Sequence, residues 1–250
     1  MAAELTSLAH HPFNPAAVTG VLRRPSTRAE LRKVFGERGI PQENGALASG
    51  TEATREIADP DFEVLGTNAS SDDVTYYAEG GIKIETDGAD NDQVIIAPHL
   101  DATQTAWAQW TWGTDKQTEW DCILGTGSSV ALVTIWAGLK LTNTSVVATD
   151  DNQAFFRVTA AGNFAAIYSI GGVDVSTDTG VTVAASTTYR LRIQIDSARI
   201  ARFWIDDVLV CTSTALADAI DLIPYVGIHA NTAAAKHMYL YEECISRVRG

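Results

Sequence analysis

The feature that most constrains the fold is an alternating stretch between Tyr189 and Val210. Apolar and polar side chains alternate through residues 189–196, which is the pattern of a β-strand with one buried and one solvated face. Short polar turns at 197–199 and 206–207 separate this run from two further strand-like runs. The stretch therefore predicts an antiparallel meander and an all-β fold. Its first apolar positions are Tyr189, Leu191, Ile193 and Ile195, and the polar ones are Arg190, Arg192, Gln194 and Asp196.

Short strand-like runs recur from Phe62 to the C-terminus, with Gly, Asp and Asn turns between them. Such a series without a long helical period is typical of two packed antiparallel sheets. The chain has 250 residues, of which 46 % are hydrophobic, and this is enough apolar material for one large sandwich. We therefore predict a two-sheet β-sandwich over residues 62–250.

Residues 1–61 differ in composition from the rest and predict an extended N-terminal arm and linker. Four of the seven prolines lie in the first 41 residues. Thr27 and Glu30 have the spacing of a capping box, and an apolar stripe that reaches Phe35 is ended by Gly36. These residues predict one short helix, which needs a surface to lie on because it is too short to be stable alone.

Charge is distributed unevenly along the chain. The net charge is −13, but residues 21–40 carry six basic and two acidic side chains, so the rest of the chain carries −17. An acidic body argues against nucleic-acid binding, because phosphate neutralisation supplies most non-specific affinity. The basic arm is suited to an acidic protein surface. The alternative is an ordinary solvated linker that contains some arginines.

The cysteines and the apolar runs give indications of the cellular compartment. Cys122, Cys211 and Cys244 have no metal-ligand spacing, and an odd number cannot pair fully within one chain, so we expect free thiols and a reducing cytoplasm. The N-terminus shows no basic region followed by an apolar run, and no apolar run reaches the ~20 residues of a membrane span. We expect neither a signal peptide nor a membrane segment.

Three stretches resemble a known fold family. They are TTYRLRIQID (187–196) followed by ARFWIDDVLV, the near-terminal IPYVGIHANTAAAKHMYLYEECISRV (223–248), and the early Trp-rich run TAWAQWTW. Together they are similar to the central hairpin, the closing strands and an early strand of the concanavalin A-like jelly roll of the LamG and glucanase type, over residues 65–249. The usual Asn-Gly turn is Asp206-Asp207 here, and the usual Asp of the closing strand has no clear counterpart among 241–243.

Jelly rolls with a proline-rich arm and free cysteines are similar to virion proteins of tailed bacteriophages. This resemblance implies a capsid decoration or cement protein, made in the host cytoplasm and carried on the capsid surface, with no enzymatic activity and no cofactor. Its partners would be the major capsid protein and further copies of itself, as a trimer, with no nucleic acid and no membrane. We expect the arm to lie along the shell. The predicted capsid-binding residues are Phe13, Arg23, Arg24, Arg28, Arg32, Val34 and Phe35.

The alternative function is a carbohydrate-binding, lectin-like module of a phage fibre or tail. Sugar binding needs exposed aromatic rings. Trp204 lies beside Arg202 on the polar side of its strand and is the best candidate for a surface contact. Alternation puts Trp110 and Trp112 on one face, so we predict that both belong to the core.

Candidate chemistry is sparse. Glucanase-type relatives use a strand with Glu-x-Asp and a third carboxylate; Glu119 and Asp121 share a face here, but Ile and Leu follow, so we predict no catalysis. Acidic clusters at 87–92 and 150–152 are the candidates for Ca²⁺, although Asp and Asn in turns serve the backbone first. His229 and His237 lie at the ends of a loop and are expected to face each other as a hydrogen-bonded pair.

Overall fold

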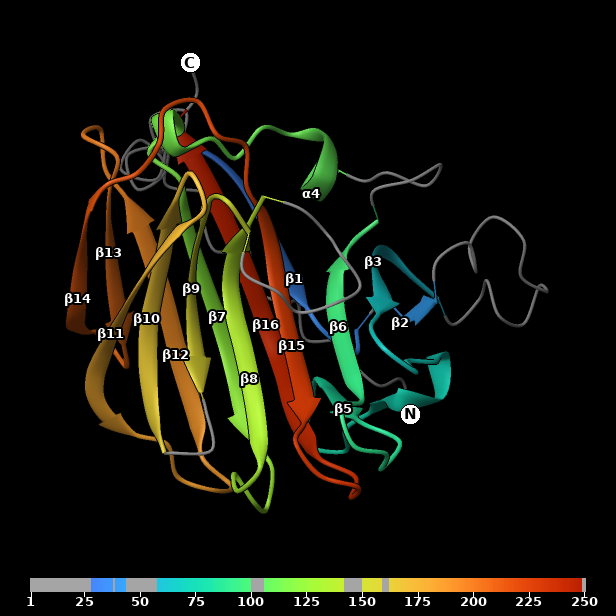
Figure 1. Cartoon of the computed structure of the whole chain (residues 1–250). Helices are drawn as coiled ribbons and strands as arrows, with labels where there is room; N and C mark the ends of the chain where they lie inside the picture. Colours follow the sequence, from blue (N-terminus) through green and yellow to red (C-terminus); the bar gives the residue numbers. More distant parts are fainter. Residues whose placement is uncertain are drawn as a thin grey trace, which may run out of the picture.

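Two eight-stranded sheets pack face to face in the computed structural model (Figure 1). The structure describes residues 28–37, 39–43, 58–99, 106–141, 150–158 and 162–248. No helix among these residues is long and apolar enough to cross a membrane. Every strand pair is antiparallel except one, and the architecture is a jelly-roll sandwich, as the sequence predicts.

Sheet A lies behind in Figure 1 and sheet B in front. In order, sheet A contains β14 (Val208–Ala215), β13 (Ile200–Ile205), β12 (Thr188–Ile195), β7 (Glu119–Thr126), β16 (His237–Val248), β5 (Ile82–Glu85) and β4 (Val74–Tyr76), and β1 (Arg28–Val34) pairs with β16 beside β5. Sheet B contains β11 (Val173–Thr182), β10 (Asn163–Ile170), β9 (Gln153–Val158), β8 (Val133–Lys140), β15 (Ile223–Ala230), β6 (Gln93–Pro98), β3 (Ala58–Leu65) and β2 (Ile40–Glu43). The short helices are η1 (Ser71–Asp73), α4 (Ala106–Gln109) and η2 (Thr114–Lys116).

The predicted meander is confirmed as β12, β13 and β14. Asp206 and Asp207 have φ values of 48° and 65°, which is the positive-φ pair that a tight hairpin turn requires. The alternating apolar residues of β12 point into the space between the sheets, where Leu191, Ile193 and Ile195 are fully buried. The pattern therefore identified both the strand and its buried face.

The two tryptophans near α4 do not share an environment. Trp112 is fully buried and its indole N–H donates to the carbonyl of Trp107 at 2.8 Å, whereas Trp110 is 36 % exposed. Residues 106–109 form a helical turn and not a strand, so the period of two does not apply before Trp112. The prediction that both belong to the core is wrong for Trp110.

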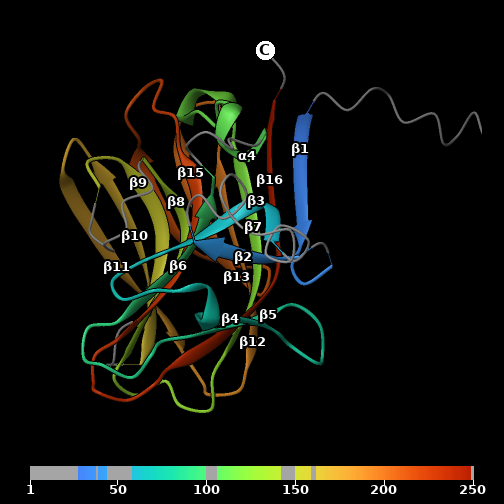
Figure 2. The ribbon, with the colours of Figure 1, turned by 90° about the vertical axis from the view of Figure 1, so that its right-hand side faces the viewer.

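The predicted short N-terminal helix is a strand. β1 runs antiparallel to β16, from Arg28 opposite Val248 to Val34 opposite Glu242 (Figure 2). Its residues alternate, with Ala29 and Lys33 buried while Glu30 and Arg32 are exposed. The edge of β16 beyond β5 offers backbone groups to pair with, and this outweighs a local helix signal.

The N-terminal strands are tied into the sandwich by buried contacts. Lys33 Nζ lies 2.6 Å from a carboxylate oxygen of Asp59, and both side chains are almost fully buried. Phe35 is 1 % exposed and packs edge-to-face on Phe62, with 5.1 Å between the ring centroids. Among the described residues, the first strand of the sandwich therefore begins at Arg28, ahead of residue 62, where the sequence predicts the sandwich to begin.

Candidate functional site

The outer face of sheet B carries aromatic side chains that are buried. Tyr225, Phe155 and Trp136 are only 1 %, 3 % and 9 % exposed. Trp136 stacks on His229 with 5.9 Å between ring centroids, and Lys140 Nζ lies 4.3 Å from the centre of the Tyr225 ring. The accessible surface of these rings is too small for stacking on a ligand.

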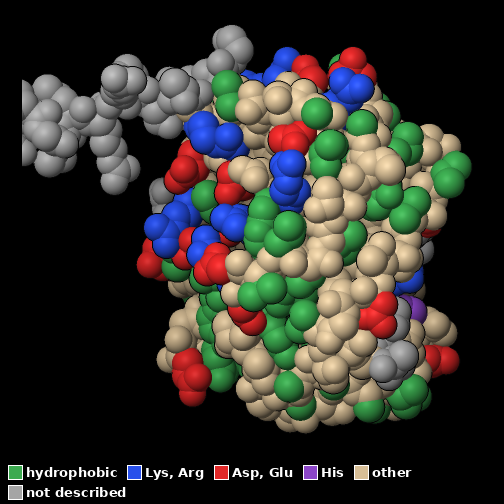
Figure 3. Space-filling model, turned by 90° about the vertical axis from the view of Figure 1, so that its left-hand side faces the viewer, with side chains coloured by type: hydrophobic (Ala, Val, Ile, Leu, Met, Phe, Trp, Pro, Cys, Tyr) green, Lys and Arg blue, Asp and Glu red, His purple; other side chains and the backbone are tan. Residues whose placement is uncertain are grey.

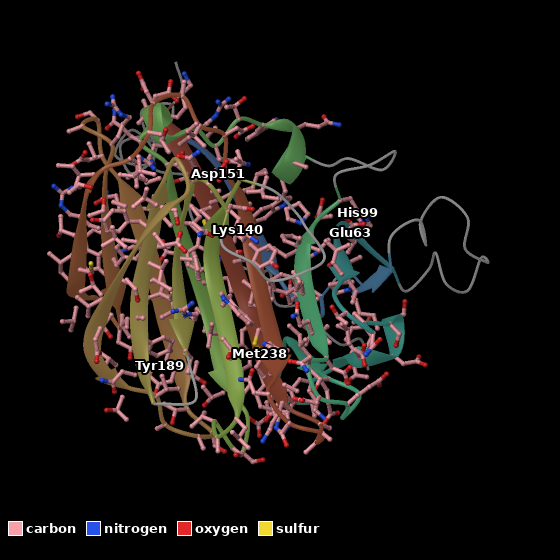
Figure 4. All side chains as sticks on the ribbon, in the orientation of Figure 1. Glu63, His99, Lys140, Asp151, Tyr189 and Met238 are labelled. Carbon is pink, nitrogen blue, oxygen red and sulfur yellow. The ribbon has the colours of Figure 1, made fainter. Side chains whose placement is uncertain are left out.

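Ionisable groups on this face are buried as well. Figure 4 shows Lys140 in the upper part of β8, and Glu63 and His99 together on the β3–β6 side. Lys140 Nζ lies 3.7 Å from Asp150, and His99 Nδ1 lies 3.3 Å from Glu63. Burial lowers the pKa of Lys140 and raises the pKa of Tyr225. These side chains are therefore engaged in buried polar and aromatic contacts.

The outer face of sheet A, here called the open face, is accessible. It consists of the outward side chains of β1, β5, β16, β7, β12 and β13, together with the neighbouring Tyr77 and Glu79. Charges of both signs gather along it, on the left of Figure 3. Two hollows formed by described residues lie on it, and both are lined in part by β7, β12 and β16.

The first, here called the tyrosine hollow, has a volume of about 270 Å³. Tyr77, Tyr239 and Tyr241 lie along one side, all half-buried. Their ring centroids are 4.1 Å apart for Tyr77 and Tyr239, and 6.5 Å apart for Tyr239 and Tyr241, whose planes are within 27° of parallel. The Tyr77 and Tyr241 centroids are 6.4 Å apart, so the three rings form a compact cluster beside polar residues of the 186–188 segment. The remaining lining residues are Glu79, Gly125, Thr126, Ser186, Thr187 and Thr188.

A β-bulge sets the direction in which the Tyr241 side chain points. The pairing of β16 with β7 shifts register between Leu240 and Glu242, at the point where the partner on the other edge changes from β5 to β1. The backbone N–H of Phe35 donates to the carbonyl of Tyr241 at 2.9 Å, which satisfies the interrupted ladder. Because of the shift, Tyr241 and Glu242 both face outward and Glu243 turns into the core.

A glycine beneath the rings makes room for them. A Cβ atom at Gly125 would lie 3.1 Å from the Tyr241 hydroxyl oxygen and 3.4 Å from Tyr239 Cβ. Any larger residue at this position of β7 would push the rings of Tyr239 and Tyr241 away from the sheet. The tyrosine hollow therefore depends on one small residue in the adjacent strand.

The second hollow, here called the charged hollow, has a volume of about 400 Å³. Arg32 donates to both carboxylate oxygens of Glu242, at 2.8 and 2.7 Å, and Arg190 donates to Asp121 at 3.1 Å. Burial raises the pKa of Asp121, while the neighbouring Arg190 opposes that shift. Glu30, Cys122, Ile123 and Cys244 complete the lining.

Comparison with solved structures identifies the fold. A protein of unknown function from Shewanella oneidensis MR-1 matches with a TM-score of 0.57 and 13 % identity, covering 99 % of this chain and 97 % of that one. The β-glucanase of Bacillus licheniformis matches with a TM-score of 0.55 and 8 % identity (89 % and 99 % covered), and alginate lyase A1-II′, of polysaccharide lyase family 7, with 0.53 and 12 % (76 % and 96 %). The fold is a concanavalin A-like jelly roll. No protein-family model matches the chain, and no curated protein matches it.

Glu119 and Asp121, the nearest match to a glucanase strand, do share the open face of this jelly roll. Asp121 lines the charged hollow. Glu119 lies outside it, 3.8 Å from Arg28 and 3.9 Å from Arg192. Both carboxylates therefore stand within 4 Å of arginines.

Trp204, the predicted surface contact, lies at the β13 end of the same face. The guanidinium carbon of Arg192 sits 4.3 Å from the centre of its ring. The arginine therefore covers the ring surface that a sugar would need, and Trp204 is half-buried. It lines neither hollow.

Four of the predicted capsid-binding residues lie within the described range, in and next to β1. Phe35 lies in the core, so it is inaccessible as an anchor for a partner. Arg28 donates to the side chain of Ser246 and to the carbonyl of Gln117, and Arg32 binds Glu242. Val34 is half-buried at the end of β1. Phe13, Arg23 and Arg24 lie outside the described residues.

The acidic clusters and the histidines have structural roles in this jelly roll. Asp92 is buried and accepts from Asn68 and from the Ala89 backbone, and Asn152 accepts from the Gly171 backbone. Among the described residues, no group of three or more His, Cys, Asp or Glu is placed to hold a metal ion. The predicted pairing of His229 with His237 is wrong, because His229 stacks on Trp136 of sheet B while His237 packs on Tyr239 of sheet A.

Sequence reasoning missed the tyrosine cluster. The closing strand reads HMYLYEE, and its alternation up to Tyr241 indicates one polar, aromatic face. Tyr77 lies far away in sequence, and only the pairing of β16 with β5 brings it next to Tyr239.

Proposed function

We propose that the protein binds carbohydrate on the open face, with the tyrosine hollow as the stacking platform. The observation that carries the proposal is the cluster of Tyr77, Tyr239 and Tyr241 along one side of a hollow on the open face. Tyrosine offers a large, rigid, amphipathic contact area whose ordering costs little entropy. Sugar rings present C–H faces that pack on such rings.

Polar groups beside the tyrosines supply the hydrogen bonds that a sugar needs. Ser186 and Thr188 are exposed at the rim, and each hydroxyl both donates and accepts. The carboxylate of Glu79 adds an acceptor. An apolar surface with a few convergent polar groups is the usual composition of a small-molecule site.

We propose binding without catalysis. Glycoside hydrolysis requires one carboxylic acid and one carboxylate on either side of the bond. In the charged hollow, Glu242 is held bidentately by Arg32, and Asp121 is held by Arg190. Both carboxylates therefore already accept from guanidinium groups, and neither is free to approach a glycosidic bond as the acid or the base.

The competing proposal is the capsid decoration protein. It loses support from the structure, because the described residues of the predicted arm form β1, β2 and the start of β3, and Phe35 lies in the core. The capsid proposal still predicts that the protein self-associates and that it binds a capsid protein. Size-exclusion chromatography with light scattering, together with sedimentation with empty capsid shells, tests those two points separately.

A glycan array tests the carbohydrate proposal. We expect the full chain to bind a defined set of glycans, and the Tyr239→Ala variant to lose that binding. Tyr76→Ala is the matched control, because Tyr76 is 54 % exposed and lies outside both hollows. An array without any signal, or equal loss with both variants, would overturn the proposal.

A further inference from the structure

We infer that the carbohydrate is an oligosaccharide that carries free amino groups; this rests on the proposed function and names its ligand class. The inference starts from the pairing of charges on the open face. Each lysine or arginine on this face lies within 4.0 Å of a carboxylate. The pairs are Arg28 and Arg192 with Glu119, Arg32 with Glu242, Arg190 with Asp121 and Asp207, Arg202 with Asp196, and Lys83 with Glu85.

Two carboxylates on the open face take part in no ion pair with the described residues. Glu30 lines the charged hollow, and Glu79 lines the tyrosine hollow. Both side chains are exposed. The Glu79 carboxylate accepts a hydrogen bond from the Tyr77 hydroxyl, which leaves its charge without a counter-charge. Each hollow therefore holds one acidic group without an ion-pair partner among the described residues, while the cations of the face are already engaged.

The net charge of the charged hollow also favours a cationic ligand. Glu30, Asp121 and Glu242 line the charged hollow against two arginines, which leaves an excess of one negative charge. The chain as a whole carries −13. Such a field attracts cationic ligands and repels anionic ones, so polysaccharides built from uronic acids or sulfated sugars are disfavoured.

The separation of the two acidic groups indicates a chain and not a single sugar. Glu30 lies opposite Ser246 on β16, whereas Glu79 lies in the hollow beside Tyr241. Five residues of extended strand span about 17 Å at about 3.3 Å per residue. A ligand that reaches both carboxylates must extend along β16 over several sugar rings and can stack on the tyrosines at the Glu79 end.

Isothermal titration calorimetry with two pentasaccharides tests the inference. The glucosamine pentamer and the N-acetylglucosamine pentamer have the same backbone, but only the first carries ammonium groups. We expect the glucosamine pentamer to bind on the order of tenfold more tightly, from two exposed charge contacts. The preference should disappear in about 1 M salt, where the Debye length is about 3 Å.

Variants connect the preference to the two carboxylates. Glu30→Gln with Glu79→Gln should reduce binding of the glucosamine pentamer to the level of the acetylated one. Asp218→Asn removes one negative charge from an exposed pair with Arg199 outside both hollows, and should change nothing. If the double variant keeps the preference, the inference is wrong.

The remaining outcomes separate the inference from the proposed function. Equal binding of both pentamers would overturn the amino-sugar assignment and leave carbohydrate binding intact. Binding of neither pentamer, together with a blank glycan array, would overturn both. Pentalysine binding as tightly as the glucosamine pentamer would overturn the assignment in favour of a basic peptide.

Discussion

Glu243 gives the sharpest stability prediction, because a carboxyl group without a counter-charge lies in the core between the sheets. It is 1 % exposed, and its Oε1 accepts a hydrogen bond from the Trp120 indole at 2.6 Å. Burial raises its pKa from 4.5 to about 8, although the Trp120 hydrogen bond opposes the shift. The folded protein therefore keeps this proton over a pH range in which the unfolded chain has lost it.

The sign of the pH dependence follows from proton binding. Where the folded state binds the extra proton, stability falls as pH rises, by about 1.4 kcal/mol per pH unit. As the pH rises from the ordinary pKa to the raised value of about 8, the free energy of unfolding of the wild type therefore falls by on the order of 5 kcal/mol because of this group alone. Below this pH range the ionisation of Glu243 does not lower the free energy of unfolding, and above it the full decrease applies.

Glu243→Gln removes the titration and keeps an oxygen that accepts from Trp120. The buried amide costs about 1 kcal/mol at every pH, so the variant is slightly less stable than wild type near pH 5 and several kcal/mol more stable near pH 8. Urea unfolding of both proteins at intervals over this range measures the difference. Glu242→Gln is the control, since it loses only an exposed ion pair worth up to about 1 kcal/mol. Parallel curves for wild type and Glu243→Gln would refute the reasoning.

Three further predictions concern the N-terminal strands and the open face. Asp59→Ala leaves the Lys33 charge buried with only a 3.7 Å contact to Asp61, and should cost about 3–5 kcal/mol in urea unfolding; a loss below about 1 kcal/mol would contradict a buried pair. Deletion of residues 1–37 removes β1 and should lower the thermal midpoint clearly, whereas a free arm would leave it unchanged. Gly125→Val should displace Tyr241 and abolish saccharide binding while circular dichroism stays that of a β-protein; retained binding would mean that the ring position is unimportant.

The strands of the meander were predictable because their alternation is strict. Leu191 and Ile193 are apolar, their neighbours are charged or polar, and the structure confirms the buried face. The same rule fails for β1, where a buried position holds Lys33. A lysine at that position hides the period of two, and only Asp59 in another strand makes its burial tolerable.

The candidate site was less predictable than the fold, for a physical reason. The bulge in β16 places Tyr241 and Glu242 outward in succession and turns Glu243 inward, and this phase change depends on where β5 ends and β1 begins. Alternation within one strand cannot contain that information. Trp204 had the right sequence pattern, yet Arg192 from the neighbouring strand covers it.

Chemical-shift mapping by NMR with a glycan selected on the array is the measurement that tests the central claim most directly. If the open face binds carbohydrate, the amides of Gly125, Thr188 and Tyr239 should shift in proportion to occupancy. The resonances of amides in sheet B, such as those of Trp136 and Gly227, should not shift. Shifts confined to sheet B would contradict the account and assign binding to the opposite face of the sandwich.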